Sequence, residues 1–349
     1  MNGINMYVGK SVSAGRKPLI VLTMGDPCGV GPEICVKAAA NPDVRDSCRL
    51  VLAGDKVVLK RAEDVTKMSL VYDTLHSPAD VGAWASDAGG REASLLDCSA
   101  CAEAPEYGRA CAAGGAAAYK YLINAIDMAI SGTVSAIATA PLNKAALQMA
   151  GIRKPGHTEI LAEKTGIDDF ALMLYSSRMS LAFVTCHVAL RDVPGMLTCE
   201  RIFKVTGLLR DALLRTLGRE PRLCMLGLNP HAGEGGVFGG EEQEHIASAV
   251  RDAVERGWNV EGPVPPDAAF TPKALRKYDG HVAMYHDQGH IPFKMVSFHD
   301  GVNVTLGLPI IRTSVAHGTA FDIAGKGTAD ESSLTAAILL ASRLSGIRS

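Results

Sequence analysis

Pro-Leu-Ile-Val-Leu-Thr-Met at residues 18–24, Gly-Asp-Pro-Cys-Gly-Val-Gly at 25–31 and Pro-Glu-Ile-Cys-Val-Lys-Ala-Ala-Ala at 32–40 decide the fold class. The first run is almost wholly apolar, which predicts a strand buried on both faces, as in a parallel sheet. The glycines predict a turn, and Pro32 suits the start of a helix because its missing N–H needs no partner there. The stretch therefore predicts a strand, a turn and a helix, the repeating unit of an α/β protein.

The same alternation continues to the C-terminus. Short apolar runs predict strands at residues 50–54, 136–139, 170–175, 181–185, 223–228, 282–285, 301–306 and 310–315. Helices are predicted at residues 112–130, 161–165, 199–217, 241–257 and 332–345. Residues 74–108 are rich in Ser, Ala, Gly and Asp and show only weak periodicity. The pattern predicts an α/β fold with a largely parallel sheet, and the length of 349 residues suggests two domains of about 150 residues each.

Composition narrows the class of protein. Hydrophobic residues make up 47% of the chain but aromatic residues only 5%, so we expect an aliphatic core. The net charge of −2 gives no electrostatic reason to expect nucleic acid or a membrane surface as a partner. No apolar run reaches the roughly 18 residues of a membrane span. Residues 1–16 lack the apolar stretch of a signal peptide and are predicted to be a flexible extension.

The nine cysteines do not suggest a disulfide framework. They are an odd number, scattered among apolar neighbours, which favours small buried hydrophobes in a reducing cytoplasm. Cys98 and Cys101 form one close pair, but no second pair or nearby histidine completes a zinc ligand set.

Three histidines follow three predicted strands. His187 lies in Thr-Cys-His-Val-Ala-Leu-Arg-Asp, His231 in Asn-Pro-His-Ala-Gly-Glu-Gly-Gly and His286 in Met-Tyr-His-Asp-Gln-Gly-His. Parallel strands deliver such side chains to the open end of a sheet. A lone histidine is usually a satisfied core residue, but three in this pattern favour a shared metal site. Three imidazole ligands with an open position are typical of a catalytic centre.

Two further histidines compete with these three. His245 lies among charged residues in the helix predicted at 241–257, so we expect it to face solvent. His290 follows His286 at i+4, which on a helix could bind the same metal, but Gly289 and Pro292 argue against a helix there. We also expect polar neighbours to orient the rings. These are Asp192, Asn229, Asp287 and Gln288.

Other polar residues suggest an anion-binding site. The turn Lys154-Pro-Gly-His-Thr-Glu159 brings together His157, Thr158 and a basic residue. Lys294 and Arg312 stand in apolar surroundings. Together with Asn303 they offer cationic and donor groups that can hold phosphate or carboxylate by charge-assisted hydrogen bonds. Ordinary solvated surface charges are the alternative reading.

Two glycine-rich segments could contact a nucleotide. The loop at residues 317–330 carries glycines that allow close backbone approach, with Asp322 and Asp330 as hydroxyl acceptors, although an ordinary turn explains its composition equally well. The turn at 25–31 lacks the Gly-x-Gly-x-x-Gly order, so we do not read it, with Asp55, as a Rossmann fingerprint.

Taken together, these motifs resemble the 4-hydroxythreonine-4-phosphate dehydrogenase family, including its D-threonate and D-erythronate 4-phosphate dehydrogenase branch. The matching segments run in the family's order from about residue 18 to the C-terminus. They are Thr-Met-Gly-Asp-Pro-Cys-Gly-Val-Gly-Pro-Glu, Ala-Pro-Leu-Asn-Lys, Gly-His-Thr-Glu, Asn-Pro-His-Ala-Gly-Glu-Gly-Gly, Tyr-His-Asp-Gln-Gly-His-Ile-Pro-Phe-Lys and Gly-Leu-Pro-Ile-Ile-Arg-Thr-Ser-Val-Ala-His-Gly-Thr-Ala. The last segment, with the residues after it, also looks like the adenosine-binding loop of isopropylmalate and isocitrate dehydrogenases.

The resemblance implies a fold and an assembly. It implies the two-domain fold of isocitrate and isopropylmalate dehydrogenases, with the active site in the interdomain cleft. The cofactor-side domain would comprise residues 17–140 and 305–349, and a metal, substrate and dimerisation domain residues 141–304. It further implies a homodimer in which one subunit does not supply all three metal ligands.

The resemblance also assigns roles to residues. The divalent metal (Zn, Mg, Co, Mn or Ni) would be held by His187, His231 and His286. The substrate would be held by His157, Thr158, Lys294, Asn303 and Arg312, with Lys294 and His157 as catalytic groups. NAD or NADP would be held by His317, Gly318, Thr319, Asp322 and Gly325.

The implied reaction is the NAD- and metal-dependent oxidation and decarboxylation of a 4-phosphorylated 3-hydroxy acid. The first candidate is 4-hydroxy-L-threonine 4-phosphate, which gives 3-amino-2-oxopropyl phosphate and CO₂ in pyridoxal phosphate biosynthesis. The segments Thr-Cys-His-Val-Ala-Leu-Arg-Asp and His290-Ile-Pro-Phe look closer to the sugar-acid branch, whose product is dihydroxyacetone phosphate. A metal-dependent hydrolase is the alternative of another class, since such a centre can also activate water.

Overall fold

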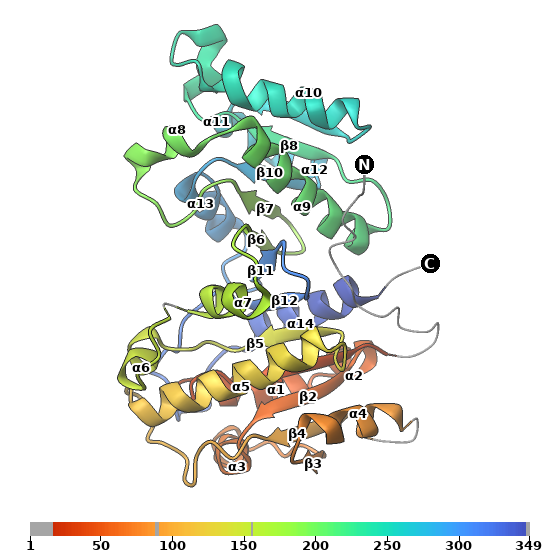
Figure 1. Cartoon of the computed structure of the whole chain (residues 1–349), viewed down its shortest axis with the longest axis vertical. Helices are drawn as coiled ribbons and strands as arrows, with labels where there is room; N and C mark the ends of the chain where they lie inside the picture. The colour runs from red at the N-terminus through yellow and green to blue at the C-terminus, as the bar shows by residue number, and fades with distance from the viewer. Residues whose placement is uncertain (1–16, 88–90, 155, 347–349) are drawn as a thin grey trace. The chain divides into compact units, whose positions relative to one another are not determined.

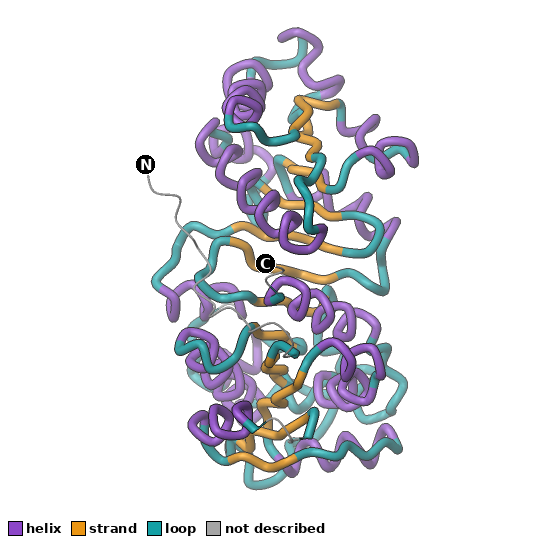
Figure 2. The backbone as a smooth tube through the Cα atoms, turned by 90° about the vertical axis from the view of Figure 1, so that its right-hand side faces the viewer, coloured by secondary structure: helices purple, strands orange, loops and turns teal. Residues whose placement is uncertain are grey.

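The computed structural model describes residues 17–87, 91–154 and 156–346 (Figures 1 and 2). The predicted extension at residues 1–16 lies outside them. The described residues form two compact units: those between 17 and 168 and between 308 and 346 form unit 1, and residues 169–307 form unit 2. The family resemblance implies boundaries at 140/141 and 304/305, and this division stays a prediction. The segment that carries His157 belongs to unit 1 because Ile160 and Leu161 pack into that unit's core.

Unit 1 is a parallel sheet with helices on both sides of the strands (Figure 2). Its strand order is β3-β4-β2-β1-β5-β12, and every pair is parallel. The strands are β1 (Leu19–Thr23), β2 (Arg49–Gly54), β3 (Asp73–Leu75), β4 (Ala93–Asp97), β5 (Ala136–Thr139) and β12 (Arg312–Val315). The helices are α1 (Gly31–Ala40), α2 (Pro42–Ser47), α3 (Lys56–Thr66), α4 (Pro78–Ser86), α5 (Ala112–Ile130), α6 (Lys144–Met149), α7 (His157–Thr165) and α14 (Ser332–Ser345).

Within the weakly periodic region at residues 74–108, a local signal locates helix α4. Helix α4 begins with a capping box: the Ser77 hydroxyl accepts from the Asp80 N–H, and the Asp80 carboxylate accepts from the Ser77 N–H. Pro78 occupies the first turn of the helix, where its missing N–H costs nothing. The motif Ser-Pro-Ala-Asp could therefore have located this helix from the sequence.

Unit 2 has strand order β11-β6-β7-β10-β8-β9. Strands β7, β10, β8 and β9 are parallel neighbours, while β6 pairs antiparallel with β7 and β11. The strands are β6 (Ala171–Tyr175), β7 (Ser180–Phe183), β8 (Leu223–Leu226), β9 (Val260–Val264), β10 (Gly280–Ala283) and β11 (Val302–Leu306). The predicted α/β class with largely parallel sheets is confirmed.

The helical segments of unit 2 include short ones beside the sheet. They are η1 (Leu190–Asp192), α8 (Val193–Met196), α9 (Cys199–Leu217), η2 (Pro230–Gly236), η3 (Glu242–Ile246), α10 (Ala247–Glu255), α11 (Pro266–Ala269), α12 (Pro272–Lys277) and α13 (His286–Val296). Within the described residues, every helix is too short or too polar to cross a bilayer.

The prediction that Gly289 and Pro292 prevent a helix is wrong, because both residues lie inside helix α13. A Cβ on Gly289 would stand 2.6 Å from a ring carbon of Phe183, so glycine is what lets the helix approach β7 closely. Phe293, on the same helix, is fully buried in the core of unit 2. Burial of such a side chain contributes about 2–3 kcal/mol and helps to offset the roughly 3 kcal/mol that an interior proline costs.

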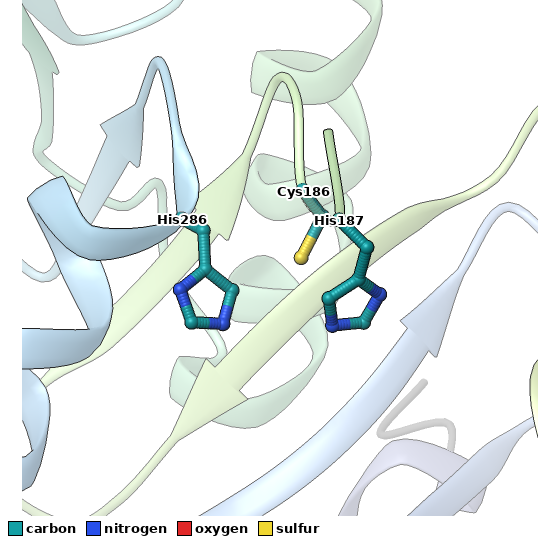
Figure 3. Close-up of side chains that lie close together, drawn as sticks. All are labelled: Cys186, His187 and His286. Atoms are coloured by element: carbon teal, nitrogen blue, oxygen red, sulfur yellow. The ribbon is translucent and has the colours of Figure 1, made fainter. Parts of the chain in front are cut away.

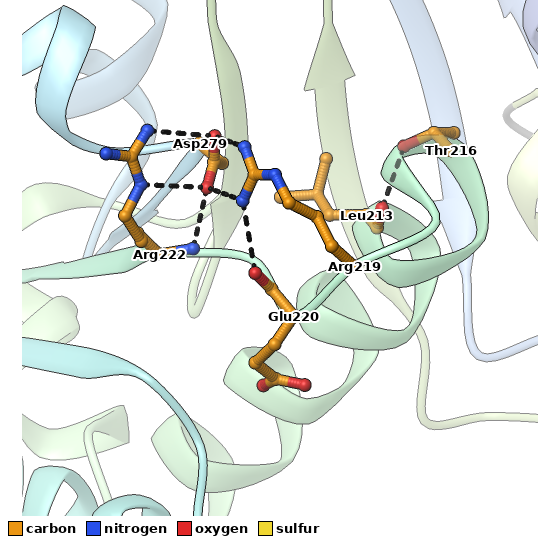
Figure 4. A network of polar contacts seen from close by, with 6 residues as sticks. All are labelled: Leu213, Thr216, Arg219, Glu220, Arg222 and Asp279. Carbon is orange, nitrogen blue, oxygen red and sulfur yellow. Dashed lines mark hydrogen bonds and ion pairs between the residues drawn. The ribbon is translucent and has the colours of Figure 1, made fainter.

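Asp279 fixes the start of two neighbouring strands (Figure 4). Its backbone N–H donates to the Arg222 carbonyl over 2.7 Å, and its carboxylate accepts from the Arg222 N–H and from both terminal nitrogens of Arg219. Burial alone would raise the pKa of Asp279, but these hydrogen bonds outweigh it and hold the pKa well below the ordinary 3.8. Strands β8 and β10 therefore start in a fixed register.

We expect Asp279→Asn to lower the free energy of unfolding at pH 7 by about 1–2 kcal/mol, since one charge-assisted acceptor is lost next to half-exposed arginines. The native pKa is depressed, so the stabilisation is complete above the unfolded-state pKa and is lost as pH falls. Urea unfolding of both proteins should show the difference shrinking below about pH 4. A difference that is constant from pH 7 to pH 3 would contradict this account.

Candidate active site

The ends of β7 and β10 are joined beyond the last residues of the strands. The Val184 N–H donates to the Ala283 carbonyl over 2.8 Å, and the N–H and hydroxyl of Thr185 donate to the Met284 carbonyl over 3.1 and 2.7 Å. The two chains therefore leave the sheet side by side. This pairing places His187 and His286 next to each other.

The two imidazoles and one thiol form a compact group (Figure 3). The ring centroids of His187 and His286 are 5.7 Å apart. One nitrogen of each ring and the Sγ of Cys186 all lie within 4.8 Å of one another. The group opens on a pocket of about 300 Å³. Among the residues that the structure describes, this is the group of His, Cys and carboxylate side chains that could hold a metal ion.

The ring of His286 is fixed on two sides. Its Nδ1 lies 2.7 Å from an Asp287 carboxylate oxygen, which leaves Nε2 as the nitrogen available to a ligand. The ring of His290 stacks on it, with centroids 3.6 Å apart and planes at 8°. His290 could bind the same metal as His286 only if this segment were helical, and the helix does form. Because the rings meet face to face, His290 supports His286 in the observed conformation.

His231 stands apart from this group. It is exposed on η2, after the parallel neighbour β8, and its backbone adopts a left-handed φ of 52°. Ala232 and Glu234 have positive φ as well. Non-glycine residues occupy this region at a cost of about 1–3 kcal/mol each. The chain thus brings together two of the three predicted ligands: His187 and His286 meet, and His231 projects from its own loop.

Two buried polar side chains hold these loops. One carboxylate oxygen of Glu242 accepts from the N–H groups of Leu228 and Asn229 over 2.8 and 2.6 Å. The amide of Gln288 accepts from the Met284 N–H and donates to the Gly227 carbonyl, both over 2.6 Å, so it connects the ends of β10 and β8. Gln288 was expected to orient the rings and instead positions backbone. Sequence reasoning gave Glu242 no role in the site.

The other expected ring-orienting residues differ in what they contact. Asp287 does bond the ring of His286. The Asn229 side chain donates to Glu241 and Glu242, over 2.8 and 3.1 Å, and so belongs to the loop scaffold. Asp192 lies 3.7 Å from Arg191 in an exposed ion pair. His245 is half-buried beside Glu244, on the π-helical turn η3.

The predicted anion ligands of unit 1 centre on Arg312. This residue begins β12, is 3% exposed, and donates to the Thr139 hydroxyl over 2.8 Å. Burial lowers the pKa of Arg312 to about 9, partly offset by the charge of Glu159. Burial and the Arg312 charge also hold the pKa of His157, at the start of α7, well below 6.5. Thr158 follows on the same helix. A desolvated cation with neutral donors nearby suits a substrate anion.

Lys294 and Asn303 belong to unit 2. Lys294 lies in the last turn of α13, half-buried, with Nζ 5.4 Å from the centre of the Phe298 ring. Burial lowers the pKa of this lysine. Asn303 is half-buried in β11, opposite Leu174 of β6. A lysine with a depressed pKa can take part in proton transfer as well as charge pairing.

The glycine-rich loop after β12 is held by Glu33 of α1. This buried carboxylate accepts from the N–H groups of Gly325 and Gly327 over 2.5 and 2.9 Å. Gly325 has a φ of +81°, and a Cβ there would meet the ring of Tyr107. The Thr319 carbonyl accepts from the Val30 N–H over 3.0 Å. Gly325 and Thr319 therefore attach the loop to the start of helix α1, through Glu33 and Val30.

The outer part of this loop is open. His317, Gly318 and Asp322 are exposed, and no atom lies within 4 Å of where a Gly318 Cβ would stand. A ligand can therefore approach the backbone here. By contrast, the carboxylate of Asp55 is buried and accepts from Ala100, Cys101 and the Tyr121 hydroxyl, so it is a structural group.

Comparison with known proteins places the chain in a family. A model of the pyridoxal phosphate biosynthetic protein PdxA matches residues 46–341. The chain belongs to the PdxA family. Two PdxA relatives are 44% identical to it: 4-hydroxythreonine-4-phosphate dehydrogenase of Trichlorobacter lovleyi (95% of this chain, 99% of the relative) and D-threonate 4-phosphate dehydrogenase of Salmonella typhimurium (93% and 98%).

A solved PdxA-type structure agrees with this assignment. The crystal structure of a 4-hydroxythreonine-4-phosphate dehydrogenase from Burkholderia phymatum superposes with a TM-score of 0.80 at 40% identity, over 95% of this chain and 99% of that one. The predicted family is confirmed, and the chain is accordingly an enzyme, a dehydrogenase.

We expect Glu242→Ala in this PdxA-family chain to lower the free energy of unfolding by about 1–3 kcal/mol, because two loop N–H groups lose their acceptor. Amide hydrogen exchange at Leu228 and Asn229 should accelerate. Glu244→Ala, on the exposed side of the same turn, is the matched control and should change neither. Equal exchange in both variants would show that Glu242 does not hold the loop.

Proposed function

We propose that this enzyme is an NAD- and divalent-metal-dependent dehydrogenase that oxidises and decarboxylates a 4-phosphorylated 3-hydroxy acid. The observation that supports this most directly is the pairing of His187 with His286, with Nδ1 of His286 held by Asp287. A fixed imidazole with its other nitrogen turned to a pocket is the usual arrangement of a metal ligand.

The donor set fits a divalent transition metal. His187 and His286 would hold the ion, and we propose His231 of a second subunit as the third imidazole ligand. When bound, such a metal acts as a Lewis acid that makes the substrate hydroxyl more acidic and polarises the ketone formed from it. The open pocket leaves room for the substrate beside the two rings.

The chain's own polar groups would bind and orient the substrate. We propose His157, Thr158 and Arg312 of unit 1 and Lys294 and Asn303 of unit 2 as substrate ligands. An anionic group beside Arg312 would stabilise the desolvated guanidinium, which turns binding energy into orientation. Lys294, whose pKa is lowered by burial, is suited to hold a phosphate oxygen or to move a proton at Nζ. His157 would stay neutral and donate or accept one hydrogen bond.

The loop at residues 317–330 fits the adenosine part of NAD. His317, Gly318 and Asp322 would contact the cofactor, while Thr319 and Gly325 keep the loop in place. NAD supplies the hydride acceptor. The Asp322 carboxylate is exposed and able to accept from a ribose hydroxyl. The backbone carbonyl of Asp322 accepts from the Lys326 ammonium over 2.7 Å.

Two substrates have equal support from the relatives. The 4-hydroxythreonine-4-phosphate and D-threonate 4-phosphate dehydrogenases are both 44% identical to this chain. We propose 4-hydroxy-L-threonine 4-phosphate first, on the family's name, and D-threonate or D-erythronate 4-phosphate second.

NADH absorbance with the metal-loaded enzyme and each of the three acids distinguishes these substrates. We expect turnover on the amino acid, with release of CO₂. Turnover on the sugar acids alone would assign the second reaction. Release of inorganic phosphate without NADH would indicate a hydrolase and contradict the proposal.

A homodimer with shared centres agrees with the exposed apolar residues of unit 2. The segments that follow β7, β8 and β10, which carry the three histidines, also expose large apolar side chains. These are Val188, Leu190, Met196, Val237, Phe238, Ile291, Met295 and Phe298. Exposed apolar residues collected around a polar site are typical of an interface. We propose that this face pairs with a second copy of the chain.

Mixed dimers test the shared centre. Co-expression of His187→Ala and His231→Ala chains with two affinity tags gives dimers that contain one intact centre, because one chain supplies His187 and His286 and the other His231. We expect about half of the wild-type activity in such dimers. Each parent homodimer should be inactive with its fold intact.

The matched control is the mixture of His187→Ala with His286→Ala. These two residues lie together in one subunit, so every centre of that mixed dimer lacks a ligand. We expect no activity. Equal activity in the two mixtures would contradict a centre in which His231 comes from the partner.

A further inference from the structure

We propose that Cys186 is an additional ligand of this metal centre and makes it selective for thiophilic ions such as Zn²⁺ and Co²⁺ over Mg²⁺. The inference rests on the proposed metal site but adds a ligand and a preference to it. Soft thiolate ligands favour zinc and related ions, whereas Mg²⁺ prefers oxygen ligands.

The position of the thiol carries the inference. The Sγ of Cys186 points to the space beside the two imidazoles (Figure 3). It lies within 4.8 Å of a nitrogen of His187 and of His286. Ligand atoms of a tetrahedral zinc site, with bonds of about 2.0–2.3 Å, lie roughly 3.5 Å apart. Small side-chain rotations would therefore bring sulfur and both nitrogens onto one ion. With His231 of the second subunit as a further ligand, the ion would bind the substrate by expanding to five-coordinate.

The backbone holds Cys186 at this place. Thr185 is bonded to Met284 through its N–H and its hydroxyl, and the Val188 N–H donates to the Cys186 carbonyl. Cys186 therefore stands at the point where the chain leaves β7. The opposite wall is the start of α13, where His286 is fixed by Asp287 and stacked on His290.

The surroundings of Cys186 differ from those of the other cysteines in unit 2. Cys186 is half-buried and lines the same pocket as His187 and His286. Cys224 is fully buried in the hydrophobic core, within β8. Cys199, at the start of α9, is half-buried too, but its thiol donates to an Asp252 carboxylate 3.5 Å away. Cys199 is thus a matched control with no histidine partner in the metal group.

Cobalt spectroscopy of the full chain, stripped of metal and titrated with Co²⁺, tests the ligand. A thiolate bound to Co²⁺ gives a sulfur-to-metal charge-transfer band in the near ultraviolet, while visible bands report the bound ion whatever its ligands. We expect the near-ultraviolet band in the wild type and in Cys199→Ser, and its loss in Cys186→Ser, which should keep the visible bands.

Two failures are distinguishable. The role of Cys186 would be overturned, and the metal centre kept, if the visible bands depend on His187 and His286 but the near-ultraviolet band does not depend on Cys186. In that case the band would be absent from the wild type or would persist in Cys186→Ser. Two results would overturn the metal centre itself, and the role of Cys186 with it. One is cobalt that does not bind to the wild type, and the other is cobalt that binds to the His187→Ala and His286→Ala chains as tightly as to the wild type.

Metal competition tests the selectivity. We expect Cys186→Ser to weaken Zn²⁺ binding by at least about ten-fold and to change Mg²⁺ binding little, because a thiolate contributes little to a magnesium site. Cys199→Ser should alter neither. An equal loss for both ions would show that Cys186 shapes the loop without binding the metal.

Discussion

The parallel pairing of β7 with β10, extended past the strand ends by the bonds of Val184 and Thr185 to Ala283 and Met284, is the constraint on which the site depends. It fixes the point at which two loops leave the sheet, and therefore the distance between His187 and His286. Asp279 at the start of β10 and Gln288 beyond its end tie the same strand to β8. Hydrogen bonds of the backbone therefore determine the positions of His187 and His286, the proposed metal ligands.

Most elements of the fold could be predicted from the sequence because their signals are local. The predicted helices at residues 112–130, 199–217 and 332–345 coincide with α5, α9 and α14, whose amphipathic or Ala-rich sequences need no distant partner to be recognised. Helix α13 could not be predicted, because Gly289 and Pro292 oppose it locally and only packing against Phe183 and burial of Phe293 make it favourable. Tertiary packing there outweighs intrinsic propensity.

The candidate site also has features that could be predicted from the sequence and features that could not. Residue type and spacing were enough to select His187 and His286, which the structure brings together. They were not enough to show that His231 stands apart, that His290 stacks on His286, or that Cys186 joins the pair. These relations depend on where side chains point after strands far apart in sequence have paired. The roles of the NAD loop and the substrate ligands follow from family resemblance and stay predictions.

Buried carboxylates explain how irregular loops keep defined conformations beside the sheets. Glu242 accepts from Leu228 and Asn229, and Glu33 from Gly325 and Gly327. Each carboxylate satisfies two backbone donors that would otherwise cost about 1–3 kcal/mol apiece when buried. This stabilisation is of the same order as the cost of the left-handed backbone at His231, Ala232 and Glu234. The strained turn that presents His231 can therefore persist because Glu242 holds the chain just before it.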